Sequence, residues 1–176
     1  MKASFKLSKR ALRDQIFTLL YNQNNPEAAI LQLNLILKSA PENSQALALK
    51  AYALNKLANA RKEWKYSQSA LDHADRALLL NPSDDLALTS KGWAQIDLGR
   101  AQEALPILQR ATKVNPRNEF AWYNLAWAQY LSGDAASSTE SIKRALEISP
   151  GNEIIKRGKE LMERGAIPEH LKKPRT

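Results

Sequence analysis

"RATKVNPRNEFAWYNLAWAQYLSGD", residues 110–134, is the stretch that decides the fold of this chain. Pro116 follows one apparent helix, and five aromatic residues then fall within the eleven positions from Phe120 to Tyr130. Gly133 and Asp134 form the next stop signal. On a helical wheel the aromatic residues lie on two different faces. The segment therefore predicts one helix with two aromatic faces, and each face needs a neighbour or a ligand to cover it.

The same segment is part of a repeat. Pro82, Pro116 and Pro150 lie 34 residues apart, and each closes a similar phrase: "RALLLNP", "RATKVNP" and "RALEISP". A fixed period of this length is typical of stacked repeat architectures. Reading back from the prolines predicts two amphipathic helices per unit, at about 85–98 and 101–114, and at about 119–132 and 135–148.

Turn and cap residues stand at the expected ends of these helices. Gly99 and Gly133 fall where a helix C-terminus favours left-handed dihedrals. Asp134 can cap the following helix by accepting a backbone N–H bond, and Asn118 and Asn152 occupy equivalent positions. The local signals therefore predict helical hairpins joined by short turns.

The repeat resembles the tetratricopeptide repeat family, which places large residues, small residues and a closing proline at set positions. The unit that starts at residue 85 matches with Leu88, Gly92, Ala104, Leu108, Ala111 and Pro116. The unit that starts at residue 119 matches with Trp122, Leu125, Ala126, Ile142, Ala145 and Pro150. The resemblance implies an all-α fold: a right-handed superhelical solenoid of about four antiparallel helix hairpins plus a C-terminal capping helix.

The rest of the chain extends this array. Residues 44–82 fit the pattern but are seven residues too long, so "NARKEWK" predicts a hairpin that extends about one turn per helix beyond its neighbours. Residues 8–41 form a degenerate unit, and residues 153–164 a charged terminal helix. The predicted layout is one domain over 1–164, with repeats at about 8–41, 44–82, 85–116 and 119–150, then a basic flexible tail at 165–176.

Trp64 lies on the predicted extension of the second hairpin, next to Lys62 and Lys65. Two interpretations stay open. Trp64 covers the hairpin tip while the charged residues are solvated, or it offers a secondary docking contact for a partner.

The positive charge of the chain belongs to its two ends. The net charge is +8, yet residues 14–155 carry fourteen basic and fifteen acidic residues. A nucleic-acid-binding domain usually carries its positive charge along a face of the fold. The charge distribution of this chain differs from that pattern. Binding of nucleic acid or another anionic surface through the basic ends is thus the second hypothesis for function, not the first.

Several classes of protein are not favoured by the composition. The longest apolar runs are too short for a transmembrane helix, and the basic N-terminus lacks the apolar segment of a secretory signal. Cysteine is absent, which fits a reducing compartment, so we expect a cytoplasmic protein.

The sequence also offers no set of residues for catalysis. The two histidines, His73 and His170, have no partner at metal-ligand spacing. Asp84 and Asp85 form an acidic pair at a predicted helix N-terminus, where they complement the helix dipole. An enzyme needs several groups that converge on one pocket. We therefore expect no enzymatic activity, no metal and no cofactor.

The two faces of the helix in the opening stretch predict different roles. One face, with Trp122, Leu125 and Ala126, matches the core positions of the family. The resemblance implies that the other face lines a concave groove. The candidate groove residues are Tyr52, Asn55, Trp93, Phe120, Tyr123, Asn124, Trp127 and Tyr130. The alternative is that this second face packs against a neighbouring helix.

One family subclass binds a C-terminal carboxylate through Lys, Asn and Arg at set positions. Only Asn124 suits such a clamp here, so the chain does not fit that subclass. The leading hypothesis is a non-catalytic adaptor that binds a peptide segment or helix of a partner protein in an aromatic groove. The oligomeric state and the identity of the partner do not follow from the sequence.

Overall fold

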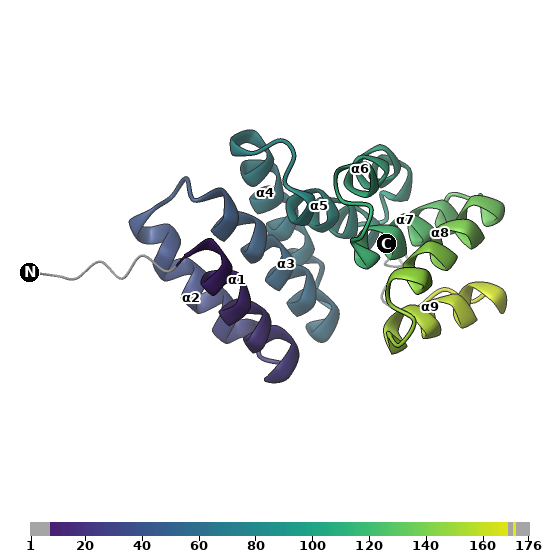
Figure 1. Ribbon diagram of the computed structural model, residues 1–176, viewed down its shortest axis with the longest axis horizontal. Helices are drawn as coiled ribbons and strands as arrows, with labels where there is room; N and C mark the ends of the chain where they lie inside the picture. The colour runs from purple at the N-terminus through teal and green to yellow at the C-terminus, as the bar shows by residue number, and fades with distance from the viewer. Residues whose placement is uncertain (1–7, 169–170, 172–176) are drawn as a thin grey trace, which may run out of the picture.

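The computed structural model describes residues 8–168 and 171, and every regular element in that part of the chain is helical. The helices follow one another in chain order along the molecule, from α1 and α2 at one end to α8 and α9 at the other (Figure 1). They are α1 (Lys9–Phe17), continued by the π-helical turn η1 (Thr18–Asn22), then α2 (Pro26–Ser39), α3 (Ser44–Arg61), α4 (Trp64–Leu80), α5 (Asp85–Asp97), α6 (Ala101–Val114), α7 (Glu119–Leu131), α8 (Ala135–Ile148) and α9 (Glu153–Glu163).

Side-chain caps mark the starts of most of the helices, as the sequence predicts, whereas α4 and α6 begin without one. The Asn118 side chain accepts hydrogen bonds from the backbone N–H groups of Phe120 and Ala121, both at 3.1 Å. Asn152 caps α9 in the same way, and Asp134 accepts from Ser137 N at 3.0 Å. These bonds satisfy backbone donors that have no partner within the helix.

Glycines close the first helices of the last two hairpins. Gly99 and Gly133 have φ values of 74° and 89°, in the left-handed region. A residue with a side chain is strained there, whereas glycine is not. The predicted turns between α5 and α6 and between α7 and α8 are confirmed.

The hairpins stack so that α3 packs against α5 and α5 packs against α7. These first helices form an inner layer, while α4 and α6 each pack between two successive first helices. Small residues allow this close approach. A Cβ added at Gly92 would lie 2.9 Å from Leu108 Cδ1 and nearer still to Leu108 Cγ, so α5 and α6 can pair this closely only with glycine at this position.

The second hairpin is longer than its neighbours, as expected from the seven-residue insertion. Helix α3 has 18 residues and α4 has 17, against 13 in α5 and 14 in α6. Lys62, with φ of 56°, ends α3 in the left-handed region, and Trp64 begins α4. The half-buried Trp64 side chain lines a small recess together with Ser67 and Asp97.

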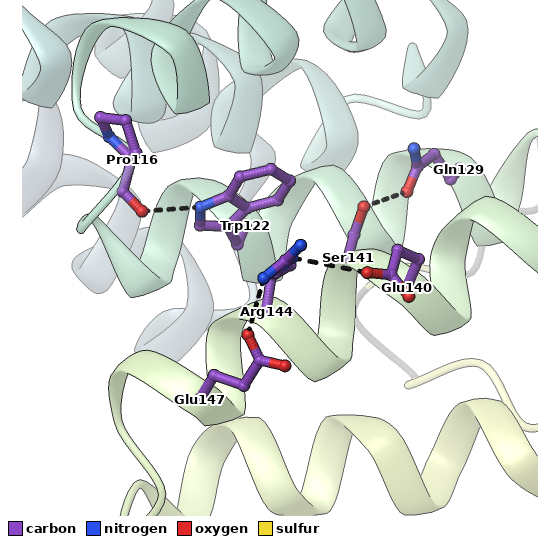
Figure 2. A network of polar contacts seen from close by, with 7 residues as sticks. All are labelled: Pro116, Trp122, Gln129, Glu140, Ser141, Arg144 and Glu147. Atoms are coloured by element: carbon purple, nitrogen blue, oxygen red, sulfur yellow. Dashed lines mark hydrogen bonds and ion pairs between the residues drawn. The ribbon is translucent and has the colours of Figure 1, made fainter.

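One aromatic face of the opening stretch packs against α8. The Trp122 Nε1–H donates to the carbonyl of Pro116 at 3.0 Å, and Ser141 Oγ on α8 donates to Gln129 Oε1 at 2.7 Å (Figure 2). Leu125 and Ala126 between them are buried. The predicted core face of α7 is therefore confirmed, and it joins the two helices of the last hairpin.

Candidate functional site

The inner layer carries a cavity of about 310 Å³ that reaches from η1 across α3, α5 and α7 to α9. Aromatic side chains from several of these elements converge on it. Its lining comprises Tyr21, Asn24, Tyr52, Lys56, Asn59, Ala60, Trp93, Ile96, Asp97, Phe120, Tyr123, Asn124, Trp127, Ile154, Pro168 and Leu171.

Six of the eight candidate groove residues line this cavity: Tyr52, Trp93, Phe120, Tyr123, Asn124 and Trp127. The other two lie beside it. Asn55 is fully buried, and its Nδ2 donates to the carbonyl of Ser90 at 2.8 Å, which joins α3 to α5. Tyr130 packs edge-on against Trp127, with ring centroids 5.7 Å apart.

The rings hold one another in edge-to-face pairs, a geometry that stabilises aromatic clusters. Tyr52 packs between Phe17 and Trp93, with centroid distances of 5.8 and 5.6 Å. On the other side of the cavity, Tyr123 lies 6.4 Å from Trp127. The cavity wall is therefore built from rings whose positions are fixed by their neighbours.

The aromatic rings among the candidate groove residues differ in how deeply they are buried. Tyr52 and Trp127 are each only 3% exposed and belong to the apolar clusters beneath the cavity. Trp93, Phe120 and Tyr123 are half-buried and present more of their rings to the cavity. Trp93 and Tyr123 also pack against neighbouring helices, but their half-buried rings and that of Phe120 still offer contact area to the cavity.

Polar groups at the cavity are partly removed from water. The hydroxyls of Tyr21 and Tyr52 hydrogen-bond to each other, and burial raises the pKa of Tyr52 well above its usual range. Lys56 Nζ lies 4.6 Å from the centroid of the Tyr21 ring, and burial lowers the pKa of Lys56. An ammonium group over an aromatic face makes a favourable cation–π contact.

Asp97 is the acidic residue in the cavity wall, and it is buried. Desolvation raises the pKa of Asp97 to about 8, while the Ser67 hydroxyl, which donates to Asp97 Oδ2 at 3.3 Å, acts in the opposite direction. Within the described residues Asp97 Oδ1 makes no hydrogen bond. At pH 7 this carboxyl is therefore mostly protonated, and it contributes little negative charge to the cavity.

Some lining residues were not among the predicted ones. Tyr21 and Ile96 occupy the position in their repeat units that Tyr130 occupies in the last unit. The repeat register could therefore have predicted them as cavity residues. Pro168 and Leu171 follow the last helix and have no counterpart in the repeat. Only the tertiary structure brings them to the cavity.

No group of three or more His, Cys, Asp or Glu side chains is placed to hold a metal ion in the described part of the chain. His73 is half-buried on α4, with Nδ1 2.7 Å from the carbonyl of Ser69. Among the same residues, none of the helices combines the length and apolar character that crossing a bilayer requires.

Stacked helical hairpins with an inner layer of first helices define the class of helical repeat solenoids. A family model described as a tetratricopeptide repeat matches residues 67–113 and 89–153. The chain belongs to the tetratricopeptide repeat family. A search of curated proteins gives no significant match.

Solved structures with the same fold include a thermophilic TPR protein, TTC0263 of Thermus thermophilus. It is 20% identical with a TM-score of 0.74, over 90% of this chain and 82% of that one. MamA from Desulfovibrio magneticus RS-1 is 20% identical with a TM-score of 0.63, over 89% and 84%. The Sgt2 TPR domain of Aspergillus fumigatus is 26% identical with a TM-score of 0.56, over 67% and 78%.

Proposed function

We propose that the chain is a protein-binding adaptor that holds a peptide segment or helix of a partner protein in the inner-layer cavity. The observation that carries the proposal is the convergence of half-buried aromatic rings from α5 and α7 on a cavity of about 310 Å³. Aromatic side chains supply large contact area at low entropic cost, which is why they recur as interface anchors. The family's general role in binding protein partners supports the same conclusion.

The chemistry of the cavity favours an apolar partner segment. Asp97 is mostly neutral at pH 7, so the cavity does not select a strongly basic ligand. Asn124 offers an amide donor and an amide acceptor that can pair with the backbone of a bound segment. The proposed ligand therefore buries aliphatic or aromatic side chains against the rings and pairs backbone groups with Asn124.

The test compares two tryptophan variants in the full chain. Trp93→Ala removes a ring from the cavity, while Trp122→Ala removes a half-buried ring from the opposite face of α7, outside the cavity. Proteins captured from cell extract by each variant and by the wild type are identified by mass spectrometry. Peptides tiled over a captured protein are then titrated by fluorescence anisotropy.

We expect Trp93→Ala to lose a partner that Trp122→Ala retains, with cooperative thermal melts in both. If all three chains captured the same partners and bound the peptides with the same affinities, the cavity would not be the partner-binding site. Phe120→Ala is the second cavity variant, and it replaces Trp93→Ala in the comparison if that variant no longer melts cooperatively. We chose these positions over Trp127 because that ring is 3% exposed and its loss would disturb the core.

A further inference from the structure

The chain reverses direction directly after the last helix. Gly165 has φ of 68°, and the N–H of Ala166 donates to the carbonyl of Leu161 at 2.8 Å. This is the hydrogen-bonded turn with which many helices end, and it favours glycine because of its left-handed dihedrals. The turn changes the direction of the chain after α9.

The returning segment reaches the candidate binding cavity. Pro168 and Leu171 line it together with Tyr123, Asn124 and Trp127. Leu171 N donates to the carbonyl of Pro168 at 2.9 Å, and this hydrogen bond joins the two residues.

Leu171 is the apolar anchor of this segment. It is half-buried and packs against the apolar cluster that contains Ile96, Leu125 and Trp127. Together with Ile167, Leu171 also lines the adjoining hollow beside Leu131. Leu171 thus covers apolar surface at one end of the inner layer, while Ile167 lies beside it and is 38% exposed.

We propose that Pro168 and Leu171 act as intramolecular occupants of one end of the cavity, with Ile167 in the adjoining hollow, and that the partner segment must displace these side chains. The partner then carries the same chemistry: an aliphatic residue followed by proline, with leucine three residues after the proline. This inference rests on the proposed function, because it names the regulation and the ligand type of the same site. It goes further in assigning Ile167, Pro168 and Leu171 as the built-in competitor.

Tethering makes this competition effective even if the segment binds weakly. A short linker gives an effective concentration on the order of millimolar. If the untethered segment binds with a Kd of roughly 0.1 mM, its attachment weakens an external ligand about tenfold. Displacing the tail should therefore raise the affinity for an external segment by about that factor.

The first measurement asks whether the tail is seated, and it needs no partner. The indole N–H resonances of the four tryptophans are recorded for the full chain, for Ile167→Ser/Leu171→Ser and for a control, Leu31→Ser/Leu79→Ser. The control leucines are 62% and 84% exposed and lie outside the cavity. We expect the Trp127 resonance to move in the tail variant alone, while that of Trp64 stays in place. An unchanged Trp127 resonance in the tail variant would overturn the inference.

The second measurement uses a fluorescein-labelled synthetic peptide of residues 164–176, "RGAIPEHLKKPRT". The control peptide has serine in place of its isoleucine and leucine, so its charge is the same. We expect the tail variant to bind the native peptide about tenfold more tightly than the wild-type chain does, and to bind the control peptide much more weakly. Equal affinities for the two chains, or for the two peptides, would contradict the inference.

The two proposals fail separately. If partner binding depends on Trp93 but the Trp127 resonance does not respond to the tail substitutions, the proposed function stands and the tail inference is wrong. If the tail contact and native-peptide binding are observed but no Trp93-dependent partner is captured, the tail contact stands and the adaptor function is wrong.

Discussion

Replacing Asp97 by asparagine should stabilise the fold, and the gain should grow with pH. Asp97 is the last residue of α5 and is 4% exposed. Its partner is the Ser67 hydroxyl at 3.3 Å, and burial raises its pKa from 3.8 to about 8. A negative charge here also lies at a helix C-terminus, where the helix dipole opposes it.

The sign of the pH dependence follows from the two protonation states. Below pH 3.8 the carboxyl is protonated in both the folded and the unfolded chain, so ionisation adds no penalty. Between pH 3.8 and about 8 the unfolded chain releases this proton while the folded chain retains it. The free energy of unfolding therefore falls as pH rises through this window, by up to about 1.4 kcal/mol per pH unit. Above about pH 8 the penalty is complete.

The asparagine side chain of the Asp97→Asn variant does not ionise, so the difference in stability between the two chains reports the ionisation of Asp97 directly. Over the two pH units from 5 to 7, the stability advantage of Asp97→Asn should grow by roughly 3 kcal/mol. Urea unfolding of both chains at pH 5, 6, 7 and 8, followed by circular dichroism, measures it. Asp72→Asn, which replaces an exposed acid on the neighbouring α4, is the matched control substitution.

A constant difference between Asp97→Asn and the wild type over this range would refute the reasoning. It would mean that Asp97 is already ionised in the folded chain at pH 5. The assignment of a neutral cavity wall would then fail as well, and the proposed ligand would need a group that pairs with a carboxylate.

Three further predictions concern packing and charge. Gly92→Ala should lower the free energy of unfolding by about 1–3 kcal/mol, because its Cβ would meet the buried Leu108; urea unfolding checks it, and an unchanged midpoint would show that α5 and α6 have room to separate. Trp64→Ala should lower stability by ~2 kcal/mol or more with partner affinity unchanged, because the ring covers the recess above Ser67 and Asp97; the reverse result would make Trp64 a docking contact. Partner affinity should change little between 50 and 200 mM salt, whereas binding through six or more phosphate contacts at the basic ends would lose about a thousandfold or more.

The helices could be placed from the sequence because local rules set their ends. The predicted helices at 85–98, 101–114, 119–132, 135–148 and 153–164 agree with the structure to within one residue. Asparagine and aspartate caps and left-handed glycines act through neighbouring backbone groups, so a few residues of sequence contain the information. The structure describes only residues 165–168 and 171 of the predicted flexible tail, because residues 169–170 and 172–176 lie outside the described residues.

The sequence by itself determined the repeat, the family and the helical face on which the candidate groove residues stand. Only the tertiary structure decided that Tyr52 and Trp127 are buried while Trp93 remains half-buried, that Asn55 bonds to the backbone of α5, and that the carboxyl of Asp97 is desolvated. It also brought Leu171 to the cavity. The physical reason is that burial and pKa depend on what covers a side chain, and here the covering groups come from other hairpins and from the segment after α9. The repeat period predicts which residues share a face, but it does not contain the contacts that cover that face.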